Sequence, residues 1–209
     1  MARRELWTGS VPRRSPFAFP RGFSGRLAGR IMARTNRARN TEVSEALEIG
    51  PQELVLEVGH GPGLLLRDLA RRTGEPVTGV DPSPEMVAMA RERNADLVRE
   101  GRLRLRTGSA CATGAATDSV DLVLSMNTIA MWPRLDDGFA EFLRVLRPGG
   151  RVVVTWHRRP RRFALTPEEL GTIAAAMRRR FCSLERVVLR ESVMFRAVAP
   201  PGTTAAGNG

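Results

Sequence analysis

Length, composition and charge exclude several classes of protein before any motif is considered. The 209 residues are 42% hydrophobic, which is enough for one substantial core but short for two full domains. No apolar run reaches roughly 18 residues, and no apolar segment follows the arginines near the start, so neither a transmembrane helix nor a secretory signal is predicted. We therefore expect a cytoplasmic protein.

The cysteines and the distribution of charge add two further limits. Cys111 and Cys182 are too few and too far apart for a disulfide framework or a metal site, so we expect two small core residues and no bound metal. The net charge of the chain is +11, and every lysine-or-arginine position is an arginine. The arginine excess lies before residue 51 and after residue 156, whereas the middle of the chain is nearly neutral.

The first fifty residues are predicted to lie outside the main domain. Residues 1–24 mix arginine, proline and glycine without a period, which indicates a flexible arm. Residues 25–50 fit two amphipathic helices, of which the second begins at Thr41 and ends before Pro51.

From residue 51 onward, short apolar runs alternate with helical patterns. The predicted strands are 54–58, 77–81, 103–106, 120–124 and 151–156, and the predicted helices are 64–72, 83–99 and 136–146. A break is expected at Pro148-Gly149-Gly150. Strands separated by helices favour right-handed crossovers, so the pattern predicts an α/β fold with a doubly wound, mainly parallel sheet.

The pattern changes after Trp156. A basic loop leads to a helix start at Thr166-Pro167, and two further strands at 184–189 and 192–198 leave no room for a helix between them. They are expected to form an antiparallel pair that completes a seven-stranded, Rossmann-like sheet. The main domain is thus predicted over residues 51–199, with a disordered tail at 200–209.

The most informative stretch is a glycine turn that leaves a buried strand and enters a helix. Gly59, Gly61 and Gly63 permit positive φ angles and close approach of a ligand to the backbone. A dinucleotide fingerprint would place its third glycine where Leu64 stands, and Glu57 would repel a pyrophosphate. The turn therefore favours a nucleoside-like ligand that carries a cation and no phosphate.

This E-x-G-x-G-x-G turn resembles the first motif of the class I S-adenosylmethionine-dependent methyltransferases. The similarity continues through residues 80–86, 118–125 and 145–151, and it covers about residues 26–198. The series is similar to the type-11 domain subgroup, which includes methyltransferases of quinone biosynthesis and of natural-product tailoring. The resemblance implies that S-adenosyl-L-methionine is the cofactor.

The resemblance also implies roles for individual residues. The backbone of the glycine turn and Glu57 would hold the ammonium group of the cofactor, and Asp81 would accept hydrogen bonds from the ribose. The remaining implied cofactor contacts are Pro82, Met86, Ser109, Ala110 and Asn127. Relatives often have Gly-Asp-Ala where this chain has Gly108-Ser109-Ala110, which weakens one adenine contact.

Other roles follow from the expected position of the acceptor. Met131 and Trp132 would line an apolar acceptor pocket or, alternatively, cap the core. His60 and His157 are candidates for a general base, although a structural role is favoured for both. An N-terminal segment from about Phe17 to Asn40 would cover the cofactor, with Arg30 or Arg34 on its carboxylate. A second subunit is an alternative roof, so a homodimer is considered.

The favoured function is in-line transfer of a methyl group to a small-molecule acceptor in secondary metabolism. One alternative is an RNA or protein methyltransferase that uses the basic flanks; others are a cofactor-binding enzyme that does not methylate and a nicotinamide oxidoreductase. Residues 127–132 lack the Asn/Asp-Pro-Pro-aromatic signature of base methylation, which disfavours nucleic acid. An anionic acceptor would suit the loop arginines Arg158, Arg159, Arg161 and Arg162, which otherwise form a solvated surface.

Overall fold

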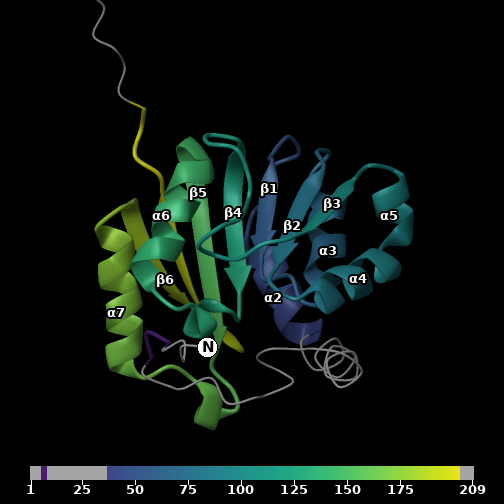
Figure 1. The fold of residues 1–209 in the computed structure, drawn as a ribbon. Coiled ribbons are helices and arrows are strands. Elements are labelled where there is room, and N and C mark those ends of the chain that lie inside the picture. Colours follow the sequence, from purple (N-terminus) through teal and green to yellow (C-terminus); the bar gives the residue numbers. More distant parts are fainter. Residues whose placement is uncertain (1–5, 9–36, 203–209) are drawn as a thin grey trace, which may run out of the picture.

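A seven-stranded sheet forms the centre of the structure, a computed structural model that describes residues 6–8 and 37–202. The strand order is β3-β2-β1-β4-β5-β7-β6 (Figure 1). The strands are β1 (Val55–Val58), β2 (Val77–Asp81), β3 (Leu103–Thr107), β4 (Val120–Met126), β5 (Leu146–His157), β6 (Cys182–Val188) and β7 (Ser192–Val198). Strands β1 to β5 pair in parallel, and β7 is antiparallel to β5 and β6. The predicted mainly parallel sheet with an antiparallel end is confirmed.

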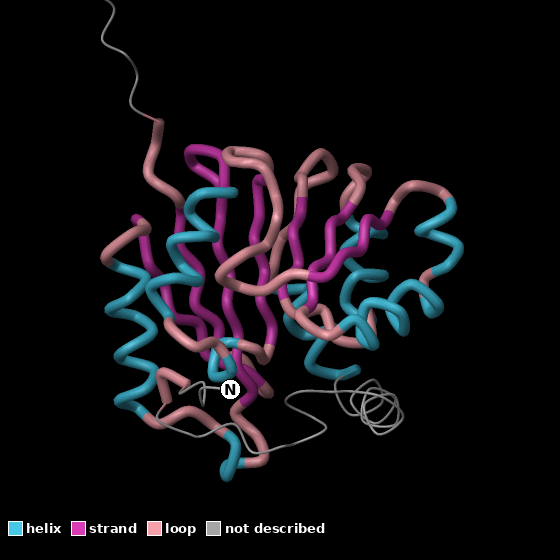
Figure 2. The backbone as a smooth tube through the Cα atoms, in the orientation of Figure 1, coloured by secondary structure: helices cyan, strands magenta, loops and turns pink. Residues whose placement is uncertain are grey.

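Helices cover both faces of this sheet (Figure 2). One face packs on α2 (Arg37–Ala46), α3 (Leu64–Arg72), α4 (Pro84–Arg93) and α5 (Ala95–Arg99), and the other on α6 (Leu135–Val145) and α7 (Pro167–Arg178). Two short 3-10 helices are η1 (Ile129–Met131) and η2 (Arg161–Phe163). Because both faces are covered, central strands such as β1 are buried along their whole length, which explains why their residues are mostly apolar.

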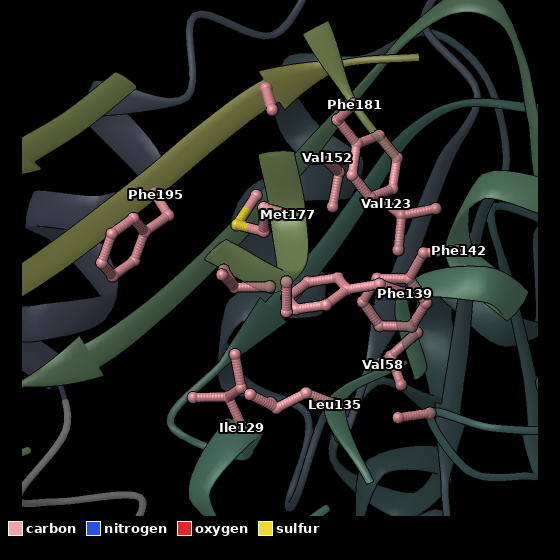
Figure 3. Close-up of a cluster of buried hydrophobic side chains, with 14 of the residues drawn as sticks. Val58, Val123, Ile129, Leu135, Phe139, Phe142, Val152, Met177, Phe181 and Phe195 are labelled. Carbon is pink, nitrogen blue, oxygen red and sulfur yellow. The ribbon is translucent and has the colours of Figure 1, made fainter. Parts of the chain in front are cut away.

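The core on the α6 and α7 side is rich in aromatic residues. Phe139 and Phe142 of α6 are fully buried, and Phe181 and Met177 pack beside them (Figure 3). The indole of Trp132 meets Phe139 and Phe142 edge to face, with ring centroids 5.4 and 5.1 Å apart. This packing anchors the chain that leaves β4, which is the segment expected to face the acceptor.

Local sequence signals account for several helix starts. The Ser83 side chain accepts a hydrogen bond from the Met86 N–H and begins α4. Thr166 and Glu169 form a reciprocal capping box at the start of α7, with Pro167 in the first turn. The predicted start of this helix is thus confirmed.

Several predicted element boundaries differ from the structure, and three of the differences have a structural consequence. The helix expected to begin at Thr41 begins at Arg37. The single helix expected over 83–99 is broken at Asn94, because its side-chain amide donates to the carbonyls of Gly63 and Ala90. The break expected at 148–150 lies inside β5. Leu146 pairs with Val120 of β4 and Arg151 pairs with Leu122, so the residues between Leu146 and Arg151 form a bulge in the strand.

The cysteines are also placed differently from the expectation. Cys182 is exposed and Cys111 is half-buried, so neither is a core residue. Cys182 begins β6, the outermost strand of the sheet, where side chains can face solvent on both sides. Neither Cys111 nor Cys182 forms a disulfide bond in the structure.

The start of the chain is described only at residues 6–8. There the Trp7 indole N–H donates to the Ile129 carbonyl at 2.6 Å, and the ring packs against the α6 and α7 core. Most of the predicted arm, most of the first predicted helix and residues 203–209 of the predicted tail lie outside the described residues. Among the helices that are described, none combines the length and the hydropathy needed to cross a membrane.

Two helical glycines offer a matched test of the core packing. A Cβ atom at Gly138 of α6 would lie 2.6 Å from Cε3 of Trp132, whereas one at Gly171 of α7 would meet nothing within 4 Å. We expect Gly138→Ala to lower the free energy of unfolding by about 1–3 kcal/mol. Gly171→Ala is expected to raise it by about 0.5–1 kcal/mol. Urea denaturation measures both, and a Gly138→Ala variant as stable as Gly171→Ala would contradict this packing.

Candidate functional site

The glycine turn and Asp81 are brought together by the parallel pairing of β1 with β2. Leu56 and Val58 lie opposite Thr78 and Val80, so the two strands end at the same edge of the sheet. The Gly59 N–H donates to the Val80 carbonyl at 2.7 Å. Beyond it, the Gly61 N–H donates to the Asp81 carboxylate at 2.8 Å. The two predicted parts of the site therefore form one hydrogen-bonded unit.

The three glycines of the turn serve different purposes, although all have positive φ. A Cβ atom at Gly59 would clash with the Thr128 side chain, and one at Gly63 would lie 2.7 Å from the Cβ of Ala90. At Gly61 the same atom would meet nothing within 4 Å. Gly59 and Gly63 thus permit close packing within the protein, and Gly61 borders open space that a ligand can use.

Glu57 places an acidic group beneath this turn. Its side chain is buried in the centre of the sheet with only 3% of the residue exposed, and its Oε2 atom has no hydrogen-bond partner. Burial, together with smaller contributions from the nearby Asp81 and Asp68 charges, raises the pKa of Glu57 from its ordinary value of 4.5 to about 8. A buried acceptor of this kind fits a ligand that brings a hydrogen-bonding cation.

The Asp81 carboxylate already holds two backbone groups. One oxygen accepts from Gly61 N–H, and the other accepts from Ser83 N–H at 2.9 Å. Burial raises the pKa of Asp81, while His60 and these backbone hydrogen bonds act in the opposite direction. Each carboxylate oxygen can accept more than one hydrogen bond, so Asp81 retains capacity for ligand hydroxyl groups.

His60 lies within the turn, against the backbone. Its Nδ1 is 2.7 Å from the Gly61 carbonyl oxygen, and its ring packs on Gly79. Burial lowers the pKa of His60, with the Asp81 charge opposing this effect. The imidazole is thereby positioned to support the turn.

The hydroxyl groups of Ser125 and Thr128 connect the glycine turn to the segment after β4. Neither residue was predicted from the sequence. The Ser125 hydroxyl donates to the Val58 carbonyl at 2.9 Å and lies 2.5 Å from the Thr128 hydroxyl. The Trp132 indole N–H donates to Thr128 Oγ1 at 3.0 Å. A buried serine within the apolar strand 120–126 was the available signal for this connection.

Asn127 and His157 meet where β4 and β5 end. Asn127 has a φ of 56°, and its Oδ1 is 3.2 Å from His157 Nδ1. Burial and, to a smaller extent, the Arg39 charge lower the pKa of His157 to about 4, against an opposing contribution from the Phe163 backbone. The imidazole is therefore uncharged near neutral pH.

The other predicted site residues occupy varied environments. Trp132 is only 4% exposed and belongs to the aromatic core, whereas Met131 is half-buried. Met86 and Ala110 are buried, Ser109 is half-buried and Pro82 is exposed. Arg30 and Arg34 lie outside the described residues. Across the part of the chain that is described, no three acidic, histidine or cysteine side chains gather to hold a metal ion.

Comparison with known proteins identifies the family. A methyltransferase domain model matches residues 55–150. YdaC of Bacillus subtilis, described as an uncharacterized methyltransferase, is 30% identical over 152 residues, which are 72% of this chain and 81% of that protein. The chain belongs to the S-adenosylmethionine-dependent methyltransferases. The predicted family, enzyme class and cofactor are confirmed, and the nicotinamide oxidoreductase alternative is set aside.

Two further proteins show how far the similarity of this methyltransferase extends. Demethylmenaquinone methyltransferase of Tropheryma whipplei is 36% identical over 53% of this chain and 44% of its own length, so the chain spans less than half of that relative. Phosphoethanolamine N-methyltransferase 2 of Haemonchus contortus, solved with S-adenosyl-L-methionine, superposes with a TM-score of 0.64 at 20% identity. That comparison covers 78% of this chain and 53% of the other, and it shows a shared fold.

The residues of the methyltransferase fit the cofactor of its family. The unpartnered Oε2 of Glu57 suits an ammonium group, and the open space at Gly61 admits a ligand beside the backbone. Both features lie next to the Asp81 carboxylate, which is linked directly to Gly61. A cation and a pair of hydroxyl groups can therefore be held within one short segment of the sheet edge.

Burial of Glu57 also affects how stability depends on pH. The pKa of Glu57 is raised in the folded protein, so the protonated side chain favours the folded state. Its full contribution to the free energy of unfolding is present below about pH 4.5 and is lost as the pH rises toward 8. We expect Glu57→Gln to gain stability relative to the wild type across this range, by at most about 1.4 kcal/mol per pH unit. Urea denaturation at several pH values measures this gain, with the exposed Glu100→Gln as control. A pH-independent difference would contradict the buried position of Glu57.

Proposed function

We propose that the protein transfers the methyl group of S-adenosylmethionine to a small molecule held at the ends of β4 and β5. The observation that carries this proposal is the unit formed by Glu57, the glycine turn and Asp81, which lies beside the Asn127 and His157 pair. Bound there, the cofactor would supply a methyl group activated by a sulfonium. The protein then has to hold two reactants in line and exclude water.

The cofactor half of the proposal follows from the chemistry of each group. Glu57 would pair with the ammonium group of the methionine moiety, and the turn at Gly61 would lie against it. Asp81 would accept hydrogen bonds from the ribose hydroxyls through the capacity that its two backbone contacts leave. Pro82, Met86, Ser109 and Ala110 are proposed for the adenine side.

Positioning can account for much of the rate in a reaction of this kind. In-line displacement at a methyl carbon needs no covalent enzyme intermediate, and correct placement of two reactants can contribute about 7–11 kcal/mol to lowering the barrier. The left-handed backbone of Asn127 turns the chain across the end of β4. Its fixed conformation and its contact with His157 would give the acceptor a rigid wall.

The acceptor half rests on fewer contacts. Half-buried Met131 offers an apolar surface next to Asn127, and Arg39 brings positive charge close to His157. This combination favours an apolar acceptor with an anionic group, and the name of the Tropheryma whipplei relative is consistent with a small-molecule acceptor. The proposal also includes a place in secondary metabolism. The cofactor would be covered either by the N-terminal segment, with Arg30 or Arg34 on its carboxylate, or by the second subunit of a homodimer.

Pairing of Glu57 with an ammonium group predicts that cofactor binding releases protons. Near pH 7 a carboxyl group with a pKa of about 8 is mostly protonated, so forming the ion pair should release about one proton per cofactor bound. Calorimetry in two buffers of different ionisation enthalpy measures this number. Glu57→Gln should release none and bind more weakly, while Glu100→Gln should match the wild type. Tight binding without proton release would contradict the proposed pairing.

The class of acceptor can be tested with methyl-labelled cofactor. A cell extract is divided into small molecules, RNA and protein, and each fraction is incubated with the enzyme or with Asp81→Ala, which should not hold the cofactor. We expect enzyme-dependent label in the small-molecule fraction. Label confined to RNA or protein would overturn the proposal in favour of a macromolecular substrate. Bound cofactor with no label in any fraction would indicate an enzyme that does not methylate.

A further inference from the structure

Two large apolar side chains stand out on the described surface, and they lie at the same edge of the sheet. Phe163 of η2 is 54% exposed, and Val188 at the end of β6 is 59% exposed. Val188 lies opposite Val193, which in turn lies opposite Trp156. The Trp156 indole N–H donates to the Phe163 carbonyl at 2.7 Å. Trp156 of β5 therefore contacts the Phe163 backbone on one side and lies in register, through Val193 of β7, with Val188 of β6 on the other.

The loop after β5 is joined to the turn between β6 and β7. The Arg158 N–H donates to the Glu191 carbonyl, and the Arg158 guanidinium donates to the Leu189 carbonyl, both at 2.8 Å. The Arg159 carbonyl accepts from the Arg39 guanidinium of α2. These contacts hold loop and turn as one continuous surface beside the ends of the strands, at the lower side of Figure 1.

Exposed arginines lie on the same loop and turn as the apolar pair. Arg158, Arg159 and Arg161 are exposed, and the side chain of Arg190 is 89% exposed. The acidic group within this turn is Glu191, which is 3.7 Å from Arg190. Glu42 of α2 faces the same turn and accepts a hydrogen bond from the Glu191 N–H. We call the set Arg158, Arg159, Arg161, Phe163, Val188 and Arg190 the basic apolar edge.

We propose that the basic apolar edge binds the surface of an anionic lipid bilayer. Arginines attract anionic headgroups, and exposed aromatic and aliphatic side chains gain by entering the boundary between headgroups and acyl chains. Both kinds of side chain occur here on one surface, supported by a fixed loop. The combination suits an interface that presents charge and hydrocarbon together.

Val188 distinguishes a bilayer from nucleic acid as the partner. Nucleic acid offers phosphates to the arginines and base faces to aromatic rings, but it offers little to an exposed valine. The edge also has a single exposed ring, Phe163, rather than a row of rings on which successive bases could stack. A hydrocarbon boundary would engage Phe163 and Val188 alike.

Docking by this edge would turn the end of β5 toward the bilayer. His157 ends β5 and directly precedes the loop that carries the arginines, so the proposed acceptor position lies next to the docking surface. An acceptor dissolved in the bilayer would then have a short path to the enzyme. This consequence for the acceptor rests on the proposed function, whereas bilayer binding itself does not.

Co-sedimentation of the full chain with vesicles tests the proposal. Vesicles of phosphatidylcholine are compared with vesicles that also contain phosphatidylglycerol, and we expect binding only to the anionic ones. Arg161→Gln with Arg190→Gln should weaken that binding about tenfold or more. The matched control is Arg104→Gln with Arg106→Gln, which removes equal charge from exposed positions on β3 and should change binding less.

The apolar contribution has its own variant. Phe163→Ser with Val188→Ser keeps every charge and should weaken vesicle binding several-fold, because exposed hydrocarbon is removed. Cofactor binding by calorimetry shows that each variant is folded, so failure of docking can be distinguished from failure of the proposed function. Absent or equal binding to both vesicles, insensitivity to the serine variants, or tighter binding to total RNA than to anionic vesicles would overturn the proposal.

Discussion

The hydrogen bond from Gly61 N–H to the Asp81 carboxylate is the contact on which the site depends. It joins the turn after β1 to the end of β2, and Asp81 also holds the following loop through Ser83. Parallel pairing places both strand ends at the same edge, and the positive φ of Gly61 directs its N–H toward the carboxylate. The open space beside Gly61 therefore lies next to an acceptor group whose position is already set.

Glu57 gives this preformed edge its electrostatic character. The carboxyl group is buried beside Asp81 and near Asp68, so its charge is unfavourable in the folded protein until a cation compensates it. A stabilising sequence would have an apolar residue at this position of a central strand. In the proposed function this cost is offset by the ammonium group of the cofactor, which would link cofactor binding to the protonation of Glu57.

Most of the fold could be predicted from the sequence because its signals are local. The helix 64–72 and the strands 77–81 and 192–198 coincide with their predicted ranges. The errors arise from contacts between distant segments. Asn94 ends its helix by donating a hydrogen bond to the carbonyl of Gly63, which lies 31 residues earlier in the chain. The proposed acceptor surface was least predictable because Asn127 and His157 meet only through the pairing of β4 and β5.

The central claim is that Glu57, Gly61 and Asp81 hold the cofactor. The most direct test is a crystal structure of the protein with S-adenosylhomocysteine. The account predicts the amino group of the ligand within hydrogen-bond distance of Glu57 Oε2, its ribose hydroxyls on Asp81 and its sulfur toward Asn127. A ligand bound elsewhere, or bound here with Glu57 still unpartnered, would contradict the account.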